Sequence, residues 1–251
     1  MLVENYRAGT MAKLGMDWET LRGWNPRLIY AAVSGFGQTG PYRSRPAYDL
    51  VVQGMGGILS LTGHGDGRPV RVGTSIGDIT AGLFGLSGVL AALYDREQTG
   101  KGTQVDIGML DCQVAILENA VSRYFAEHQV PGALGLRHPS ITPFAGLRAQ
   151  DGEYLILAAG NDSMFQQLCA LLDCPDLAAE ARFATNHQRT EHHAALYAAL
   201  ERALAAKPAA EWLDLLTRGG IPCSTVKNIE QVVNDPQAVS YTHLRAHETL
   251  R

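Results

Sequence analysis

The fold is decided by one continuous apolar run of strand length, Arg27-Leu28-Ile29-Tyr30-Ala31-Ala32-Val33-Ser34. Polar and apolar residues do not alternate in it, and such a run is typical of a strand buried in a parallel sheet. The run leads into Gly35-Phe36-Gly37-Gln38-Thr39-Gly40-Pro41-Tyr42, a loop dense in residues that interrupt helices and strands. Helical and strand patterns alternate around this pair, so the first half of the chain predicts an α/β domain.

Helical patterns follow on the C-terminal side of the loop. Asp49 to Leu61 predicts one helix whose glycines indicate close backbone packing or the approach of a ligand. The strongest helical pattern begins after Gly77-Asp78 and makes one face continuously apolar. The residues of that face are Ile79, Leu83, Leu86, Leu90 and Leu93. Gln104 to Ile107 then predicts the next strand.

The second half of the chain changes character. Phe144–Arg148 and Tyr154–Ala159 predict a hairpin that turns at Asp151-Gly152, and helices and one short strand follow. This pattern predicts a large α/β domain at residues 1–130, a linker at 131–143 and a small α+β domain at 144–238.

Composition excludes several classes of protein. The 251 residues are 46% hydrophobic and 18% charged with a net charge of −4, which does not favour binding to nucleic acid or to an anionic membrane. There is no run of eighteen apolar residues, so we expect no membrane span. The cysteines have no metal-ligand spacing and predict reduced thiols in a cytoplasmic protein without a metal site. They are Cys112, Cys169, Cys174 and Cys223.

Asp78 is the residue most indicative of chemistry, and the local sequence leaves two roles open. An aspartate before an apolar helix is typical of an N-cap, whose carboxylate accepts free backbone N–H groups. A carboxylate at a helix N-terminus beside glycines can also be a nucleophile, because the helix dipole keeps it ionised. The two roles are compatible.

A series of blocks resembles the class III CoA-transferases, in the same order along the chain. The first blocks are Val3 to Thr10, Asn25 to Tyr30, Ser34 to Tyr42 and Pro46-Ala47-Tyr48-Asp49. Gly77-Asp78 stands where that family keeps its catalytic aspartate. The later blocks are Thr99 to Asp106, Leu110-Asp111, Ala159-Gly160-Asn161-Asp162, Asp176 to Asn186 and Gly220-Ile221-Pro222-Cys223. The resemblance runs from Val3 to about Ala238.

The resemblance implies transfer of CoA between two carboxylic acids, with the acyl-CoA thioester as substrate and no permanently bound cofactor. Asp78 would form an aspartyl anhydride and then an aspartyl-CoA thioester. Asp49 continues the catalytic block, and Gly160 and Asn161 would form a lid over Asp78. The fold implied is an incomplete Rossmann-like domain followed by the smaller domain, and the family forms interlocked homodimers.

The same resemblance implies a site for CoA itself. Asn5 and Tyr6 stand near the CoA nucleotide in the family, and Lys13, Arg43 and Arg45 could meet its phosphates. The alternative for Tyr6 is a core position, and for the three basic residues it is a solvated surface charge.

Two other functions remain open. The family includes α-methylacyl-CoA racemases, which place a histidine–aspartate pair where this chain has Tyr48-Asp49. Two-base proton exchange suits a histidine with a pKa near 6.5 better than a tyrosine with a pKa near 10, so we predict a transferase. A non-catalytic acyl-CoA binder is the second alternative, whereas no motif supports a dinucleotide or P-loop site.

Both ends are expected to be incomplete. The family has a further βαβ unit before the block at Val3 and returns to the large domain after the small one. Residues 239–251 have no family counterpart and correspond to the translation of a transposon-based sequencing adapter. We therefore expect a library artefact there, with no metal pair at His243 and His247, and an enzyme fragment that is inactive without its missing segments.

Overall fold

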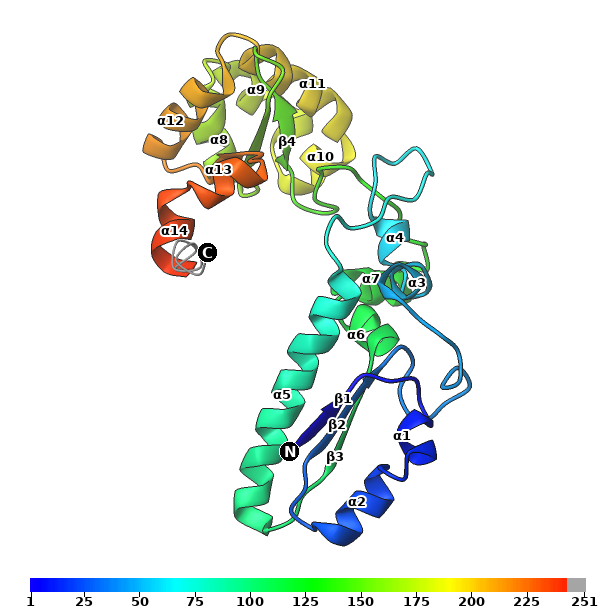
Figure 1. Ribbon diagram of the computed structural model, residues 1–251. Coiled ribbons are helices and arrows are strands. Elements are labelled where there is room, and N and C mark those ends of the chain that lie inside the picture. Colours follow the sequence, from blue (N-terminus) through cyan, green and yellow to red (C-terminus); the bar gives the residue numbers. More distant parts are fainter. Residues whose placement is uncertain (243–251) are drawn as a thin grey trace. The chain divides into compact units, whose positions relative to one another are not determined.

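The computed structural model describes residues 1–242 and divides the chain into two compact units. The first unit is Met1–Gly135 and the second begins at Leu136, a division that falls inside the segment 131–143. Figure 1 shows the elements of both units, each of which has its own sheet.

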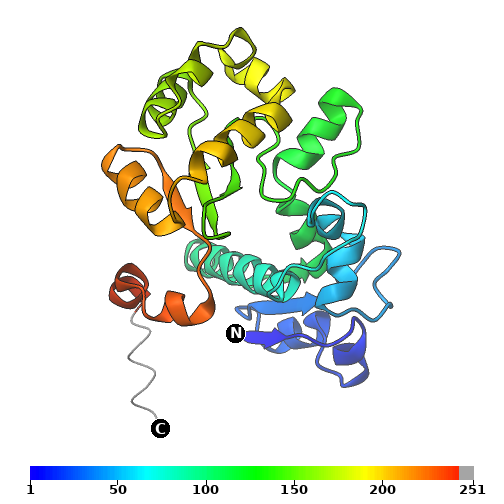
Figure 2. The same ribbon diagram turned by 90° about the horizontal axis from the view of Figure 1, so that it is seen from above.

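A three-stranded parallel sheet forms the centre of the first unit. Its order is β1 (Leu2–Glu4), β2 (Tyr30–Ser34) and β3 (Gln104–Gly108). Helices α1 (Thr10–Lys13) and α2 (Trp18–Trp24) lie on one face, and α5 (Ile76–Thr99) lies on the other (Figures 1 and 2). Coverage on both faces explains why the central strand is an uninterrupted apolar run, and the predicted parallel α/β fold is confirmed.

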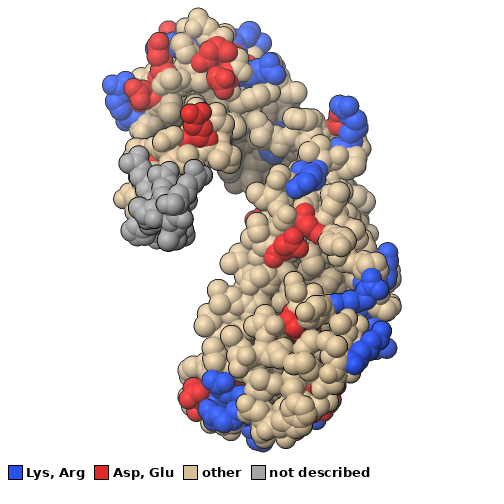
Figure 3. Space-filling view, in the orientation of Figure 1, with Lys and Arg blue, Asp and Glu red and all other residues tan. Residues whose placement is uncertain are grey.

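Helix α5 packs on the sheet through its smallest residues. A Cβ added to Gly88 would lie 2.6 Å from Cγ1 of Val105, and one added to Gly85 would lie 3.6 Å from Val33. The large apolar side chains therefore point outward, and Leu83 is 59% exposed. Figure 3 shows that the surface over α5 carries few charged side chains before its C-terminal end. Close approach of the backbones, and not size of the side chains, determines which face is buried.

The helix predicted from Asp49 to Leu61 is two helices. It divides into α3 (Asp49–Met55) and α4 (Ile58–Leu61), because Gly57 adopts φ +85°, which an α-helix does not allow. The remaining helices of this unit are α6 (Met109–Ala115) and α7 (Asn119–Glu127).

The second unit has an antiparallel sheet covered by helices. Strands β4 (Phe144–Arg148) and β5 (Tyr154–Ala158) form the predicted hairpin, and β6 (Cys223–Thr225) pairs with β5. Its helices are α8 (Asp162–Leu171), α9 (Pro175–Ala179), η1 (Ala181–Phe183), α10 (Asn186–Glu191), α11 (His193–Leu204), α12 (Ala209–Arg218), α13 (Ile229–Val233) and α14 (Pro236–Thr242). Leucines of α8, α11 and α12 and the hairpin form the core. His243 and His247, and with them most of the predicted tail, lie outside the described residues.

Within residues 1–242, one helix has the length and apolar composition of a membrane span. It is α5, with 24 residues and a mean hydropathy of 1.7 in its most apolar window. Core helices of water-soluble proteins have the same length and composition, so these properties do not distinguish a membrane span from a core helix.

Two glycines of α5 provide a matched test of its packing. We expect Gly88→Ala to lower the free energy of unfolding by about 1–2 kcal/mol, because stiff Val105 must move to admit a methyl group. A Cβ at Gly82 meets no atom within 4 Å, so Gly82→Ala should raise stability by up to about 1 kcal/mol through helix propensity. Urea unfolding of both variants measures the difference, and equal effects would contradict this packing.

Candidate functional site

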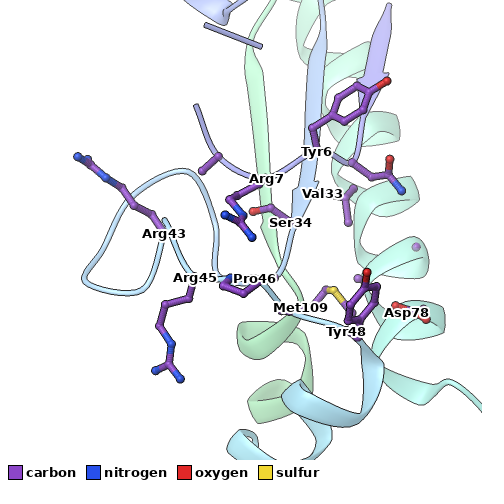
Figure 4. Close-up of a pocket in the computed structure, with 16 residues that line it drawn as sticks. Tyr6, Arg7, Val33, Ser34, Arg43, Arg45, Pro46, Tyr48, Asp78 and Met109 are labelled. Atoms are coloured by element: carbon purple, nitrogen blue, oxygen red, sulfur yellow. The ribbon is translucent and has the colours of Figure 1, made fainter. Parts of the chain in front are cut away.

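A cavity of about 610 Å³ lies in the first unit where the parallel strands end. Its walls are the residues that follow β1, the end of β2 and the loop after it, the first turns of α5 and the start of α6 (Figure 4). Ligands of open α/β sheets bind at the carboxyl ends of the strands, so this is the position in which the fold favours a site. The lining residues are Asn5, Tyr6, Arg7, Ala8, Val33, Ser34, Gly35, Arg43, Arg45, Pro46, Ala47, Tyr48, Asp78, Ala81, Gly82 and Met109.

Asp78 presents a free carboxylate to this cavity. The helix begins after the N-cap Ser75, so Asp78 is the third residue of α5, and of the two roles that the local sequence left open for Asp78 the N-cap is wrong. Its side chain has no hydrogen-bond partner in the described part of the chain. Burial of the carboxylate, and then the negative charge of Asp49, raise the pKa of Asp78 above its usual value. Asp78 remains exposed to solvent at the cavity, so the group is an accessible, unengaged carboxylate at a helix N-terminus.

Asp49 is outside the lining of the cavity, and its carboxylate is engaged. Oδ1 accepts the backbone N–H of Gly77 at 2.9 Å, and Oδ2 accepts Nε2–H of Gln53 at 2.7 Å. The Asp49 carboxylate therefore joins α3 to the first turn of α5, at the residue that precedes Asp78. The sequence could not indicate this contact, because Asp49 and Gly77 are 28 positions apart.

The residues predicted to meet the CoA nucleotide follow β1. Asn5 and Tyr6 line the cavity, and the backbone N–H of Tyr6 donates to Oε2 of Glu4 at 2.7 Å. Glu4 is only 8% exposed, and this burial raises its pKa. The buried carboxylate thus fixes the backbone that carries the two predicted residues into the cavity wall.

The three predicted basic residues have different surroundings. Arg45 lines the cavity and lies over the rings of Tyr42, at 4.7 Å, and Phe36, at 5.7 Å. Arg43 also lines the cavity, but Figure 4 shows its side chain extending away from Asp78. Lys13, in the last turn of α1, does not line the cavity. Arg45 is thus held in place by the aromatic side chains of its own loop.

Gly160 and Asn161 belong to the second unit, where hydrogen bonds hold both. The carbonyl of Gly160 accepts Nη2–H of Arg189 at 2.9 Å, and Asn161 caps α8 by accepting the Met164 N–H at 2.8 Å. Arg189 is fully buried and also donates to Thr142 and Phe183 carbonyls. The lid role of Gly160 and Asn161 over Asp78 stays a prediction.

The cavity contains two polar residues, Arg7 and Ser34, that the sequence did not indicate as site residues. Arg7 stood inside a block that was noted for Asn5 and Tyr6, and Tyr48, which distinguishes the racemases, also lines the cavity. Ser34 ends β2, and its Oγ is buried without a partner among the described residues. The position of Ser34 at the carboxyl end of the predicted central strand was the signal that could have indicated it. Within residues 1–242, no three His, Cys, Asp or Glu side chains are arranged to hold a metal ion.

The sequence matches CoA-transferase family III over residues 1–250. It is 45% identical over 241 residues to an acetyl-CoA:oxalate CoA-transferase of Acetobacter aceti. The alignment covers 96% of this chain and 62% of that protein. It is 38% identical over 242 residues to a succinate–glutarate CoA-transferase of Agrobacterium fabrum. That alignment covers 94% of this chain and 59% of the relative. The chain thus spans about three fifths of the length of these relatives.

Solved structures agree with the fold. A CAIB/BAIF family protein from Brucella suis superposes with a TM-score of 0.82 at 39% identity, covering 95% of this chain and 63% of that one. Rv3272 from Mycobacterium tuberculosis gives a TM-score of 0.86 at 33% identity, covering 96% and 64%.

The raised pKa of Asp78 predicts that this carboxylate costs stability. Ionisation is less favourable in the folded state, so the penalty is complete above the raised pKa and absent below the usual value of 3.8. We expect Asp78→Asn to raise Tm at pH 7 and the gain to disappear as the pH falls below 3.8.

Asp17 provides a control of opposite sign. It caps α2, and its bonds to Thr20 lower its pKa, so Asp17→Ala should lower Tm at pH 7. Calorimetry across this pH range measures both variants. A lower Tm for Asp78→Asn at pH 7 would contradict the proposed cost.

Proposed function

The chain belongs to CoA-transferase family III, and on that premise we propose that the complete protein moves CoA from an acyl-CoA thioester to a carboxylic acid, with Asp78 as the nucleophile. The observation that carries the proposal is the free carboxylate of Asp78 in a cavity at the carboxyl ends of the strands. A group that must form and break covalent bonds in each turnover is best left without fixed partners. An elevated pKa also accompanies a more basic, and hence more nucleophilic, carboxylate.

The proposed reaction proceeds by exchange at acyl carbons. The Asp78 carboxylate attacks the donor thioester and expels the CoA thiolate, which leaves a mixed anhydride. The thiolate attacks the aspartyl carbonyl of this anhydride and releases the donor acid, which leaves an aspartyl-CoA thioester. The acceptor carboxylate then repeats the two steps in reverse order, and the product acyl-CoA and a free Asp78 result. CoA enters and leaves as a substrate, with no permanently bound cofactor.

Positive charge in the cavity wall supports the CoA site. Arg7 and Arg45 line the same cavity as Asp78, and a guanidinium can bind a phosphate or a carboxylate in a bidentate manner. Asn5 and Tyr6 are proposed to contact the nucleotide portion. Lys13 lies outside this wall, so its proposed contact with a CoA phosphate has less structural support than that of Arg45.

The composition of the cavity favours transfer over racemisation. Tyr48 lines the cavity with Asp78, at the position where the racemases have the histidine of their catalytic pair. Proton exchange at the α-carbon needs a base on each face of the substrate, and a phenol is a weak base at neutral pH. Among residues 1–242, no histidine side chain lines this cavity.

The acceptor is proposed to be a small dicarboxylic acid. The relatives reported above are named for oxalate and glutarate, and the arginines of the cavity wall suit an anion with two carboxylates. A cytoplasmic location is proposed from the four cysteines, which lack disulfide and metal-ligand spacing. An interlocked homodimer and a lid formed by Gly160 and Asn161 are proposed from the family resemblance alone.

Replacement of the nucleophile provides the direct test. We expect Asp78→Ala to lower kcat for transfer from acetyl-CoA to oxalate in the full-length protein by at least about 10³-fold, the order seen when a catalytic nucleophile is removed. Asp95→Asn is the matched control, because Asp95 is an exposed aspartate of the same helix outside the cavity.

Trapping of the intermediate makes this test specific. Hydroxylamine added during turnover should convert Asp78 to a hydroxamate, which peptide mass spectrometry detects. Full activity of Asp78→Ala would contradict the proposal. If the protein is instead a non-catalytic acyl-CoA binder, the wild-type protein will bind CoA but will transfer none to an added acid.

Proton exchange distinguishes the transferase from the racemase. We expect the full-length protein to incorporate no deuterium at the α-carbon of a 2-methylacyl-CoA in D₂O, because the described cavity wall has the phenol of Tyr48 where the racemases have a histidine. Mass spectrometry of the recovered thioester measures this. Exchange without CoA transfer to any added acid would establish the racemase instead.

A further inference from the structure

The carboxylate of Asp49 accepts two N–H groups directly, and the side chain of Gln53 links it to a third N–H group, that of Val72. Gly77 N–H donates to Oδ1, and Gln53 Nε2–H donates to Oδ2. The Oε1 atom of Gln53 in turn accepts the N–H of Val72 at 3.1 Å. Gln53 is fully buried, so its amide has no water to replace these partners. Two adjacent turns of α3 therefore hold both ends of the segment 72–77 that precedes Asp78.

The direction of every bond in this chain is fixed. A backbone N–H can only donate, so Val72 requires the Gln53 oxygen and leaves the Gln53 nitrogen to face Asp49. The group at position 49 must then accept on both of its atoms, because Gly77 also donates to it. An ionised carboxylate meets that requirement, whereas an amide of the same shape does not.

Packing reinforces the same contact. Val52, which is fully buried, lies against Gly77, and a Cβ at position 77 would come within 2.7 Å of its Cγ2 and 3.1 Å of Asp49 Oδ1. The first turn of α5 is thus in direct contact with α3. Because Asp78 follows Gly77 immediately, any shift of this turn moves the Asp78 carboxylate within the cavity.

Charged groups around Asp78 come from several elements. Asp49 on α3 is the charge that acts on the Asp78 carboxylate. Arg7 after β1, and Arg43 and Arg45 in the loop after β2, line the same cavity, as do the phenols of Tyr6 and Tyr48. Burial and Asp49 account for the raised pKa of Asp78, and none of the three arginines contributes to it.

We propose that Asp49 and Gln53 are positioning residues, which fix the first turn of α5 so that Asp78 meets the acyl carbon in a reactive orientation. This inference rests on the proposed role of Asp78. It revises the expectation that Asp49 is itself catalytic, because both of its oxygens are engaged and it does not line the cavity. Asp49 acts through Gly77 and through its charge, and Gln53 acts through Asp49 and Val72.

The bond directions allow a compensating exchange. Asp49→Asn places an NH₂ group opposite Nε2–H of Gln53, which leaves two buried donors facing each other. The double variant Asp49→Asn/Gln53→Glu removes the conflict. The new carboxylate at 53 accepts from Val72 and from the new amide at 49, and the amide oxygen still accepts from Gly77. The double variant keeps one negative charge but moves it one helical turn away from Gly77.

The test uses these variants in the full-length protein. We expect Asp49→Asn to lower kcat about 10–100-fold with little change in KM, because a small displacement of a reacting group has this effect. The double variant should recover most of the lost kcat. Hydrogen–deuterium exchange at the Gly77 and Val72 amides should accelerate in the single variant and return toward the wild-type rate in the double variant.

A pH profile separates position from charge. Loss of the neighbouring charge in Asp49→Asn lowers the pKa of Asp78, so the acid limb of kcat/KM should move to lower pH. The double variant should keep part of this shift although its kcat recovers, because its charge is more distant. Asp111→Asn is the control, since Asp111 is a first-turn aspartate of α6 with no side-chain hydrogen bond among the described residues.

Two results would overturn the inference. One is wild-type kcat and wild-type exchange at Gly77 in Asp49→Asn. The other is a double variant with restored amide protection but no recovery of rate, which would make Asp49 a reacting group. Amide exchange does not depend on activity, so failure of the proposed function can be told apart from failure of this inference. An active Asp78→Ala protein would contradict the proposed function. The expected exchange in Asp49→Asn and in Asp49→Asn/Gln53→Glu would still support the hydrogen-bond arrangement.

Discussion

Helix α5 approaches the sheet and α3 so closely that Gly77 and Gly88 have no room for a side chain. Strand β3, the central strand and α3 each contact this helix, so its position links the parallel sheet to the cavity. Small residues at the interface let the backbones come together, and the larger apolar residues are left on the opposite face. The same close approach brings the first turn of α5 within reach of Asp49, and through it the Asp78 carboxylate is placed at the carboxyl ends of the strands.

The electrostatics of the cavity depend on two carboxylates that differ in their hydrogen bonds. Asp78 lines the cavity, and Asp49 lies outside its lining. Asp49 accepts two N–H groups, whereas Asp78 accepts none among the described residues. The bonded carboxylate is therefore fixed in place, and the unbonded one is left accessible at the cavity with a raised pKa. Arg7, Arg43 and Arg45 line the same cavity as Asp78, so positive and negative side chains share its wall.

The sequence predicted the features that depend on local pattern. The central strand and the hairpin of the second unit were evident from apolar runs and turn residues, and Asp78 was recognised from its block. The break at Gly57 was missed, because a positive φ in one glycine is not visible in a helical pattern. The N-cap role that the local sequence left open for Asp78 is wrong, because α5 begins two residues earlier, at Ile76, after the N-cap Ser75, which has no side-chain cap bond. The Asp49–Gly77 bond joins distant segments, and only the folded backbone brings them together.

The second unit constrains what a lid could be. Arg189 donates to three carbonyls, pairs with Asp162 at 2.9 Å and lies over the ring of Phe165, all without exposure to solvent. Gly160 is bound to this guanidinium, and Asn161 is bound to α8. Loss of one such bond would leave a buried cation with an unpaired donor, which is costly. Gly160 and Asn161 are therefore fixed to α8 and Arg189 within the second unit and do not form a free loop.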